Sequence, residues 1–219
     1  MIDEILPAAV TSAESFGDEP DAWLFPEERT ALGAVGEARR SEYTTVRHCA
    51  RRALGELGLA PAPLVAGVRG APRWPEGVVG SMTHCAGYRA AATAHRSDVR
   101  ALGIDAEPHA PLPDGVLEYI ALPQEAAEIA RLARRTPQVH WDRLLFCAKE
   151  AVYKAWFPAT HSWLGFDGAV IVPAPDGTLH ARVLSPAPEQ PVPAPQEFVG
   201  RWLVRDGLLL ACAVSPPSD

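Results

Sequence analysis

Apolar positions along the 219-residue chain recur at helical spacing in three regions. Residues 27–58 carry them at intervals of three and four, which predicts a helix, broken near Ser41, that ends at Gly58. One or two helices are predicted over 114–136. Residues 140–157 show the clearest helical pattern of the chain, with a continuous apolar face.

Short apolar runs bounded by turn residues predict the strands. Residues 78–84 and 88–95 are expected to form two strands joined by a short Cys-Ala-Gly turn, and residues 99–107 a third. Beyond residue 168, four more strands are predicted over the runs AVIVP, LHARVLS, FVGRWLVR and LLLACAVS. The strands therefore fall into two groups, separated by the predicted helices.

Three stretches lack a periodic pattern and contain many prolines or glycines. Residues 1–26 are expected to be irregular, residues 60–77 a loop region, and the Pro-rich residues 185–195 an extended surface loop. Each half of the chain then shows helix followed by strands. We therefore predict an α+β protein of two similarly sized subdomains, residues 1–103 and 104–219.

Composition and charge narrow the class of protein. Hydrophobic residues make up 47% of the chain and charged residues 21%, as in ordinary soluble proteins. No apolar run reaches the roughly 20 residues of a membrane span, and the acidic N-terminus does not resemble a secretory signal, so we expect a cytoplasmic protein without membrane contact. A net charge of −7 argues against a nucleic-acid binder.

The four cysteines form no CxxC pair, so free thiols in a reduced compartment are expected. Two of them follow a histidine, in His48-Cys49 and His84-Cys85. Adjacent side chains on a helix or strand point apart, and no further ligand stands at zinc-site spacing. A structural zinc ion is therefore not expected.

The basic residues are unevenly distributed. Residues 39–52 contain five arginines against one glutamate, which indicates a local anion site in an acidic protein. Of the 20 basic residues in the chain, only Lys149 and Lys154 are lysines. Lysine is a compact charge with a tunable pKa, whereas arginine is always charged. The two lysines together therefore indicate positions at which arginine does not serve, although chance clustering is an alternative.

Two carboxylates stand at the end of the predicted strand 99–107. Asp105 and Glu107 are two residues apart, so in a strand their side chains face the same side. Close carboxylates raise each other's pKa unless a cation lies between them, and oxygen ligands of this kind suit Mg²⁺. Alone, such a pair is more often a strand end that exposes two acids to water.

A third carboxylate lies on the predicted helix 140–157. Glu150 and Lys154 are separated by four residues, which on an exposed face would be a salt bridge worth about 0.3–0.5 kcal/mol. The segment is, however, unusually aromatic for a solvent-exposed face. If Glu150 reaches Asp105 and Glu107, the three carboxylates complete a Mg²⁺ site.

These segments carry a resemblance to a known family. G-I-D-A-E (103–107), F-C-A-K-E-A-V-Y-K-A (146–155) and G-S-M-T-H-C (80–85) resemble the signature segments of Sfp-type 4′-phosphopantetheinyl transferases. Residues 39–51 and 74–88 resemble the actinobacterial PptT-like branch of that family. The resemblance implies the 4′-phosphopantetheinyl transferase fold, a monomer of two subdomains related by pseudo-twofold symmetry.

The resemblance also implies the reaction. Family members transfer the phosphopantetheine arm of coenzyme A to a serine of apo acyl or peptidyl carrier proteins and release adenosine 3′,5′-bisphosphate. The motif makes Asp105, Glu107 and Glu150 the ligands of Mg²⁺ or Mn²⁺. It makes Glu150, directly or through water, the base for the serine. Lys154 would neutralise or protonate the leaving phosphate, and Lys149 would hold the phosphates.

The contacts to coenzyme A that the resemblance implies come from both halves. Arg39 and Arg47 would bind the 3′-phosphate. A straight helix would instead place Arg40, Arg47 and Arg51 on one face, and a break near Ser41 would reconcile the two arrangements. At least two of the five arginines are expected to be solvated. The chain lacks the family's lysine near the adenine turn, so Arg69 is the candidate cation there. The further implied contacts are Gly70, Pro72, Thr83, His84, Asp105, Lys149 and Lys154.

The carrier protein is expected to dock on residues 112–140, where arginines would surround an apolar contact. The residues concerned are Arg131, Arg134, Arg135, Leu117, Ile120 and Leu132. Two other functions stay open. One is a Mg²⁺-dependent nuclease, pyrophosphatase or phosphodiesterase that uses the same three carboxylates on coenzyme A or a similar diphosphate. The other is a binding module with a structural metal. Which carriers are served, of fatty-acid, polyketide or non-ribosomal peptide synthesis, does not follow from the sequence.

Overall fold

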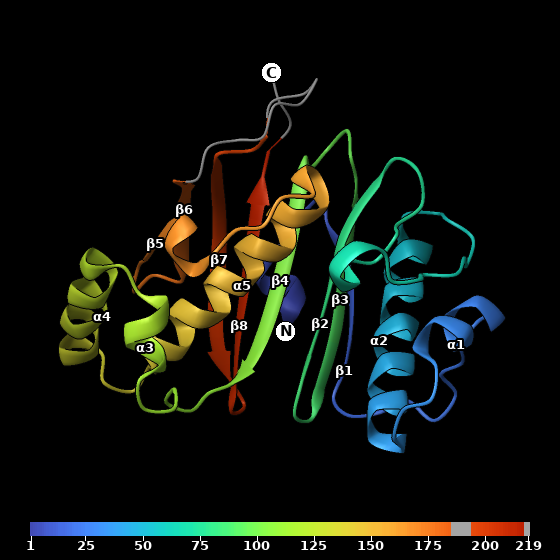
Figure 1. Ribbon diagram of the computed structural model, residues 1–219, viewed down its shortest axis with the longest axis horizontal. Coiled ribbons are helices and arrows are strands. Elements are labelled where there is room, and N and C mark those ends of the chain that lie inside the picture. The colour runs from blue at the N-terminus through green and yellow to red at the C-terminus, as the bar shows by residue number, and fades with distance from the viewer. Residues whose placement is uncertain (185–193, 217–219) are drawn as a thin grey trace.

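Two antiparallel sheets stand side by side in the computed structural model, which describes residues 1–184 and 194–216 (Figure 1). The smaller sheet has the strand order β1-β3-β2 and the larger one the order β4-β8-β7-β6-β5. The strands are β1 (Thr11–Ser15), β2 (Val78–Cys85), β3 (Tyr88–His95), β4 (Ala101–Pro108), β5 (Ala169–Pro173), β6 (Thr178–Val183), β7 (Glu197–Arg205) and β8 (Leu208–Ser215). The predicted α+β class is confirmed.

The helices cover the two sheets separately. In Figure 1, α2 lies against the smaller sheet and α5 against the larger one, with α3 and α4 beyond α5. The helices are α1 (Pro26–Leu32), α2 (Glu37–Glu56), α3 (Val116–Ile120), α4 (Pro123–Arg135) and α5 (Trp141–Thr160), with short 3-10 turns η1 (Ile2–Ile5), η2 (Val68–Gly70) and η3 (Phe166–Gly168). Most predicted elements are therefore present within a few residues of their expected bounds.

Two predictions about the N-terminal half are wrong. Residues 1–26 are not irregular throughout, because β1 pairs with β3 along its whole length. The helix predicted over 27–58 is broken at Gly33–Gly36 and not near Ser41, which lies inside α2. Gly33 has a φ of 67°, a conformation that glycine adopts at little cost, and this explains the position of the break. Residues 185–193 of the predicted Pro-rich loop lie outside the described residues.

The two sheets meet where β2 lies beside β4. Side-chain hydroxyls join these strands: the Ile104 N–H donates to Ser81 Oγ over 3.0 Å, and the Ala106 N–H donates to Thr83 Oγ1 over 3.1 Å. The predicted subdomain boundary at residue 103 falls inside β4, which pairs with β8 of the larger sheet. That boundary stays a prediction.

Gly103 allows α5 to lie directly on β4. A Cβ atom built at this position would stand 1.9 Å from the Ala151 carbonyl oxygen and 2.7 Å from the Ala155 nitrogen. No larger residue fits without moving the helix. The close approach places the side chains at the end of β4 against those of α5, which is where the candidate site lies.

Candidate active site

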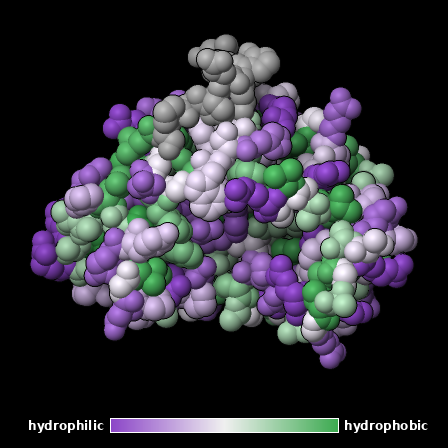
Figure 2. Space-filling model, viewed as in Figure 1, coloured by the Kyte–Doolittle hydropathy of each residue, from purple (hydrophilic) through white to green (hydrophobic). Residues whose placement is uncertain are grey.

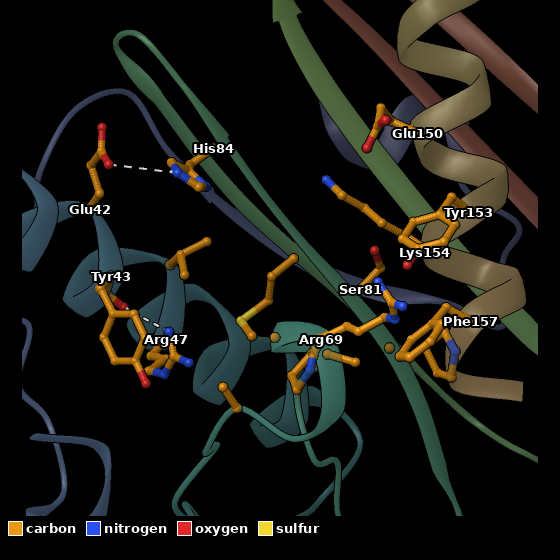
Figure 3. Close-up of a pocket in the computed structure, with 18 of the residues that line it drawn as sticks. Glu42, Tyr43, Arg47, Arg69, Ser81, His84, Glu150, Tyr153, Lys154 and Phe157 are labelled. Atoms are coloured by element: carbon orange, nitrogen blue, oxygen red, sulfur yellow. Dashed lines mark hydrogen bonds and ion pairs between the residues drawn. The ribbon is translucent and has the colours of Figure 1, made fainter. Parts of the chain in front are cut away.

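A cleft of about 340 Å³ lies between α2, the loop at residues 66–72, β2 and α5. Figure 3 shows its lining side chains, and in Figure 2 hydrophilic residues gather in the middle of this face, between the two halves. Eight sequence-predicted residues line the cleft: Arg39, Arg47, Arg69, Gly70, Pro72, His84, Glu150 and Lys154. Thr83, Asp105, Glu107 and Lys149 are not among its lining residues.

Asp105 is the buried end of a short chain of polar contacts. Its side chain Oδ1 accepts a hydrogen bond from Lys154 Nζ over 2.6 Å and one from the Thr83 hydroxyl over 3.1 Å. Within the described part of the chain, its Oδ2 is buried and has no partner. A buried carboxylate oxygen without a partner is costly, so this atom is an open position for a cation or a donor.

Thr83 contacts Asp105 at the end of β2. The residue is 1% exposed, and its hydroxyl both donates to Asp105 and accepts from the Ala106 N–H. The predicted contact of Thr83 with coenzyme A stays a prediction. The side chain of its neighbour His84 points to the opposite face of the sheet and lines the cleft.

Glu107 and Glu150 lie in the field of Asp105. Burial raises the pKa of Glu107, and the charge of Asp105 raises it further, while Arg143, whose Nη1 is 2.9 Å from Glu107 Oε2, lowers it. Burial likewise raises the pKa of Glu150, and Asp105 adds to that shift. Burial, and then the negative charge of Asp105, therefore disfavour the charged forms of Glu107 and Glu150.

These residues fit a hard divalent cation by their chemistry. The set supplies carboxylate oxygens, one of which has no partner, and two of its pKa values are raised by a neighbouring negative charge. In residues 1–184 and 194–216, no three His, Cys, Asp or Glu side chains stand close enough together to hold a metal ion. The predicted ligand set Asp105, Glu107 and Glu150 stays a prediction.

Lys154 extends from α5 into the cleft and pairs with Asp105. Burial alone would lower the pKa of Lys154, but Asp105 raises it overall, so the ammonium is charged at neutral pH. Its side chain is 30% exposed, which leaves the group accessible from the cleft. A charged donor beside an open cleft can stabilise negative charge that develops on a bound phosphate.

Lys149 does not line the cleft but lines a smaller hollow beside it, and its predicted contact with phosphates stays a prediction. Its ammonium lies 2.8 Å from Glu125 Oε2 and donates to the carbonyl oxygens of Ala169, over 3.0 Å, and of Phe166. Both members of the pair are buried. Glu125 also accepts the Ile171 N–H over 2.7 Å, so this pair ties α4, α5 and β5 together.

The arginines of α2 divide into three groups. Arg39 is half-exposed at the cleft, and Arg47 is buried beneath it, with its guanidinium carbon 3.1 Å from the Tyr43 ring centroid. Burial lowers the pKa of Arg47 to about 10. Arg51 forms a buried ion pair with Glu28 at 3.1 Å. The two remaining arginines of the segment, Arg40 and Arg52, are exposed, as expected of at least two of the five.

The loop at residues 66–72 brings Arg69 to the cleft. A bridge between Ala66 and Pro72 closes the loop, and Arg69 adopts a left-handed conformation with a φ of 52°. Its guanidinium carbon lies 5.1 Å from the centroid of the Trp163 ring, which follows α5. Arg69 therefore joins the N-terminal half to the C-terminal half through a cation–π contact with Trp163.

A second hollow of about 160 Å³ adjoins the cleft on the far side of Glu150 and Tyr153. Trp163, Leu164 and Phe166 form much of its wall. Both Glu150 and Tyr153 line the two cavities, so the aromatic residues that follow α5 continue the cleft past the carboxylates. Sequence reasoning did not single out these residues.

Other functional candidates were missed as well. Glu42 and Tyr43 lie within the arginine-rich segment and line the cleft, and Arg143 pairs with Glu107. Arg143 could have been found, because it lies seven residues before Glu150 and so on the same helical face. Tyr119 is 79% exposed on α3, within the predicted docking segment.

Part of the predicted docking surface belongs to the core. Ile120 and Leu132 are 2% and 0% exposed, packed beneath α3 and α4, so they are not free to contact a carrier. Arg131 pairs with Glu128, whereas Arg134 and Arg135 are exposed at the end of α4. Of the residues predicted for docking, the three arginines are exposed, and Tyr119 adds an exposed ring to the same region.

Comparison with known proteins places this site in a family. Residues 27–94 match the model of the 4′-phosphopantetheinyl transferase N-terminal domain, and residues 101–202 match that of the 4′-phosphopantetheinyl transferase superfamily. The chain belongs to the 4′-phosphopantetheinyl transferase superfamily, and it is a transferase of this kind. Within the described residues, no helix is long and apolar enough to cross a membrane.

Three similar proteins cover nearly the whole chain. The 4′-phosphopantetheinyl transferase Svp of Streptomyces mobaraensis is 51% identical, over 100% of this chain and 91% of its own length. PptT of Mycobacterium tuberculosis is 46% identical, over 98% of this chain and 97% of its own. Npt of Nocardia iowensis is 48% identical, over 96% and 97%. The resemblance to the PptT-like branch is confirmed.

Proposed function

We propose that this transferase moves the 4′-phosphopantetheine arm of coenzyme A to a serine of apo acyl or peptidyl carrier proteins and releases adenosine 3′,5′-bisphosphate. The observation that carries the proposal is Asp105, a buried carboxylate with one open oxygen, paired with Lys154 at the end of a cationic cleft. Family membership supports the reaction type.

Asp105, Glu107 and Glu150 would hold the Mg²⁺ or Mn²⁺ ion of the reaction. A divalent cation bound there neutralises charge on the diphosphate of coenzyme A. The raised pKa values of Glu107 and Glu150 support this assignment, because a cation between the carboxylates offsets their repulsion.

The residues of the chain divide the remaining work. Arg39, Arg47 and His84 bind nucleotide phosphates at the α2 side of the cleft. Glu150, directly or through water, takes the proton of the carrier serine. The serine oxygen bonds to the phosphorus that bears the arm, the bond from that phosphorus to the bridging oxygen breaks, and Lys154 stabilises the charge left on the departing phosphate.

The carrier protein would dock beside α3 and α4. Carrier domains are typically acidic near their serine, and Tyr119 with Arg134 and Arg135 offers an exposed ring beside two cations. Reversal of both arginine charges should raise the KM for the carrier and leave that for coenzyme A unchanged. An equal rise in both KM values would contradict this surface. We expect a cytoplasmic monomer.

The proposed reaction is tested by following nucleotide release. With coenzyme A, Mg²⁺ and increasing apo carrier, adenosine 3′,5′-bisphosphate should appear mole for mole with modified carrier, and not at all without carrier. Release of free phosphopantetheine in the absence of carrier would instead favour the pyrophosphatase or phosphodiesterase that the three carboxylates also allow. A carrier whose serine is replaced by alanine is the matched control.

A further inference from the structure

Glu42 places a negative charge inside the cleft that is proposed to bind phosphates. One of its carboxylate oxygens, Oε2, lies 3.4 Å from Arg39 Nη1 and 3.6 Å from His84 Nε2. The other, Oε1, lies 3.9 Å from Arg89 Nη2. Figure 3 shows Glu42 and His84 facing one another across the α2 side of the cleft. Three basic groups therefore converge on one carboxylate.

The three basic groups differ in how far they are buried and held by other contacts. Arg89 is buried and fixed: its guanidinium lies 2.8 Å from Asp18 Oδ1 and donates to the Cys85 carbonyl over 2.7 Å. The side chains of Arg39 and His84 are 52% and 38% exposed. Glu42 is thus held from behind by a fixed cation, while its partners at the front can turn toward a ligand.

Arg39 and His84 also contact each other, with 2.8 Å between Nη1 and Nε2. Arginine can only donate, so the Nε2 atom of His84 accepts and the imidazole is neutral in this arrangement. Burial lowers the pKa of His84, and Arg39 lowers it further, in agreement with a neutral ring. The cationic character at the front of the cleft then rests on Arg39, which is shared with Glu42.

An isolated Arg39–Glu42 pair at i, i+3 would be an ordinary helix-surface contact. The same carboxylate, however, lines the cavity that Glu150 and Lys154 line. A phosphate that binds Arg39 competes with Glu42, because the two anions accept from the same guanidinium.

We propose that Glu42 is a built-in competitor for the nucleotide phosphate. It pairs with Arg39 in the free protein, releases the guanidinium when a phosphate ester binds, and returns as the nucleotide leaves. Its role is to lower the affinity for the product and so speed product release. The proposal rests on the proposed function, since it concerns the phosphate contacts of that same cleft.

The test is direct binding of adenosine 3′,5′-bisphosphate by calorimetry, without carrier or turnover. Glu42→Gln should bind the nucleotide roughly two- to tenfold more tightly than the wild type, as expected when a competing ion pair is removed. Glu56→Gln, which removes a charge from an exposed position of the same helix, should leave the affinity unchanged. In Arg39→Ala, adding Glu42→Gln should no longer tighten binding. In turnover with carrier, Glu42→Gln should lower both kcat and the KM for coenzyme A.

Weaker binding by Glu42→Gln would overturn the proposal and make Glu42 a residue that only orients Arg39 and His84. An equal change in Glu56→Gln would assign the effect to net charge and also overturn it. Either result would leave the proposed transfer intact, provided that the wild type still modifies a carrier. An affinity for the nucleotide that Glu42→Gln leaves unchanged would overturn the proposal as well.

Discussion

The ammonium of Lys154 lies 2.6 Å from Oδ1 of Asp105 and joins α5 to β4 where the two sheets meet. The two residues are 49 positions apart in sequence. The contact leaves the second carboxylate oxygen of Asp105 buried and unpartnered. This ion pair thus directs an ammonium toward the cleft and leaves one carboxylate oxygen as an open ligand position.

Replacing Lys154 by methionine should destabilise the protein and abolish transfer. The substitution leaves Asp105 buried without its cation, which costs about 2 kcal/mol in the free energy of unfolding, somewhat less than for a fully buried pair. Urea denaturation measures the loss. The double variant Asp105→Asn with Lys154→Met should recover part of it. No recovery would show that Lys154 acts on stability through packing alone.

The stability of the protein should depend on pH through the raised pKa values of Glu107 and Glu150. The folded protein holds the protons of Glu107 and Glu150 more tightly than the unfolded chain does, because their pKa values are raised above the ordinary 4.5. Their contribution to stability is therefore full below pH 4.5 and is lost as the pH rises through the raised values. With metal chelated, Glu150→Gln should melt higher than the wild type at pH 7 and at nearly the same temperature at pH 4.

Added Mg²⁺ should reverse that order at pH 7. A ligand that binds only the folded state raises the melting temperature, and the wild type should gain while Glu150→Gln should not. Ca²⁺-free buffer with Na⁺ at matched ionic strength is the control. An equal gain in both proteins would place the cation elsewhere and contradict the role given to Glu150.

Gly103→Ala should be among the most damaging small substitutions in the chain. The new methyl group would stand 1.9 Å from the Ala151 carbonyl oxygen, so α5 must move away from β4, at a cost of about 3 kcal/mol or more. Gly55→Ala is the matched control, because its Cβ meets nothing within 4 Å and it lies in a helix. Thermal unfolding should show a large loss for the first and none for the second. Similar melting temperatures would contradict the close contact.

Substitution of Lys149 should affect stability but not the KM for coenzyme A, unlike substitution of Lys154, which should abolish transfer. Lys149→Met leaves Glu125 buried and unpaired, so the free energy of unfolding should fall by about 3 kcal/mol, while the KM for coenzyme A in the folded fraction stays the same. Glu125→Gln with Lys149→Met should restore part of the stability. A large rise in the KM for coenzyme A with stability unchanged would instead show that Lys149 binds the phosphates of coenzyme A.

Much of the fold could be predicted because strands and helices here carry their expected periods. The missed strand β1 is short and polar, with only Ala13 and Ser15 buried, so it lacks the apolar alternation that marks a strand. Periodicity alone does not locate the helix break, because the apolar spacing continues past Gly33 and Gly36, whose conformational freedom ends the first helix.

The site was predicted less evenly, for a physical reason. Motif residues on β4 and α5 come together because Gly103 fixes how these elements pack. The direction of Lys149 depends on Glu125, which lies on another helix, and periodicity alone would have placed Lys149 with Leu145 and Val152 on the buried face. The spacing places Arg143 on the same helical face as Glu150, but its pairing with Glu107 follows from the packing of α5 against β4.

The measurement that tests the central claim most directly is the intact mass of an apo carrier protein after incubation with this protein, coenzyme A and Mg²⁺. The account predicts a gain of one phosphopantetheine group on the carrier, which is lost when metal is chelated and when Glu150 is replaced by alanine. No gain on several unrelated carriers, with coenzyme A left intact, would contradict the proposed transfer to a carrier serine. A gain that survives in Glu150→Ala would keep the reaction and contradict the base assigned to it.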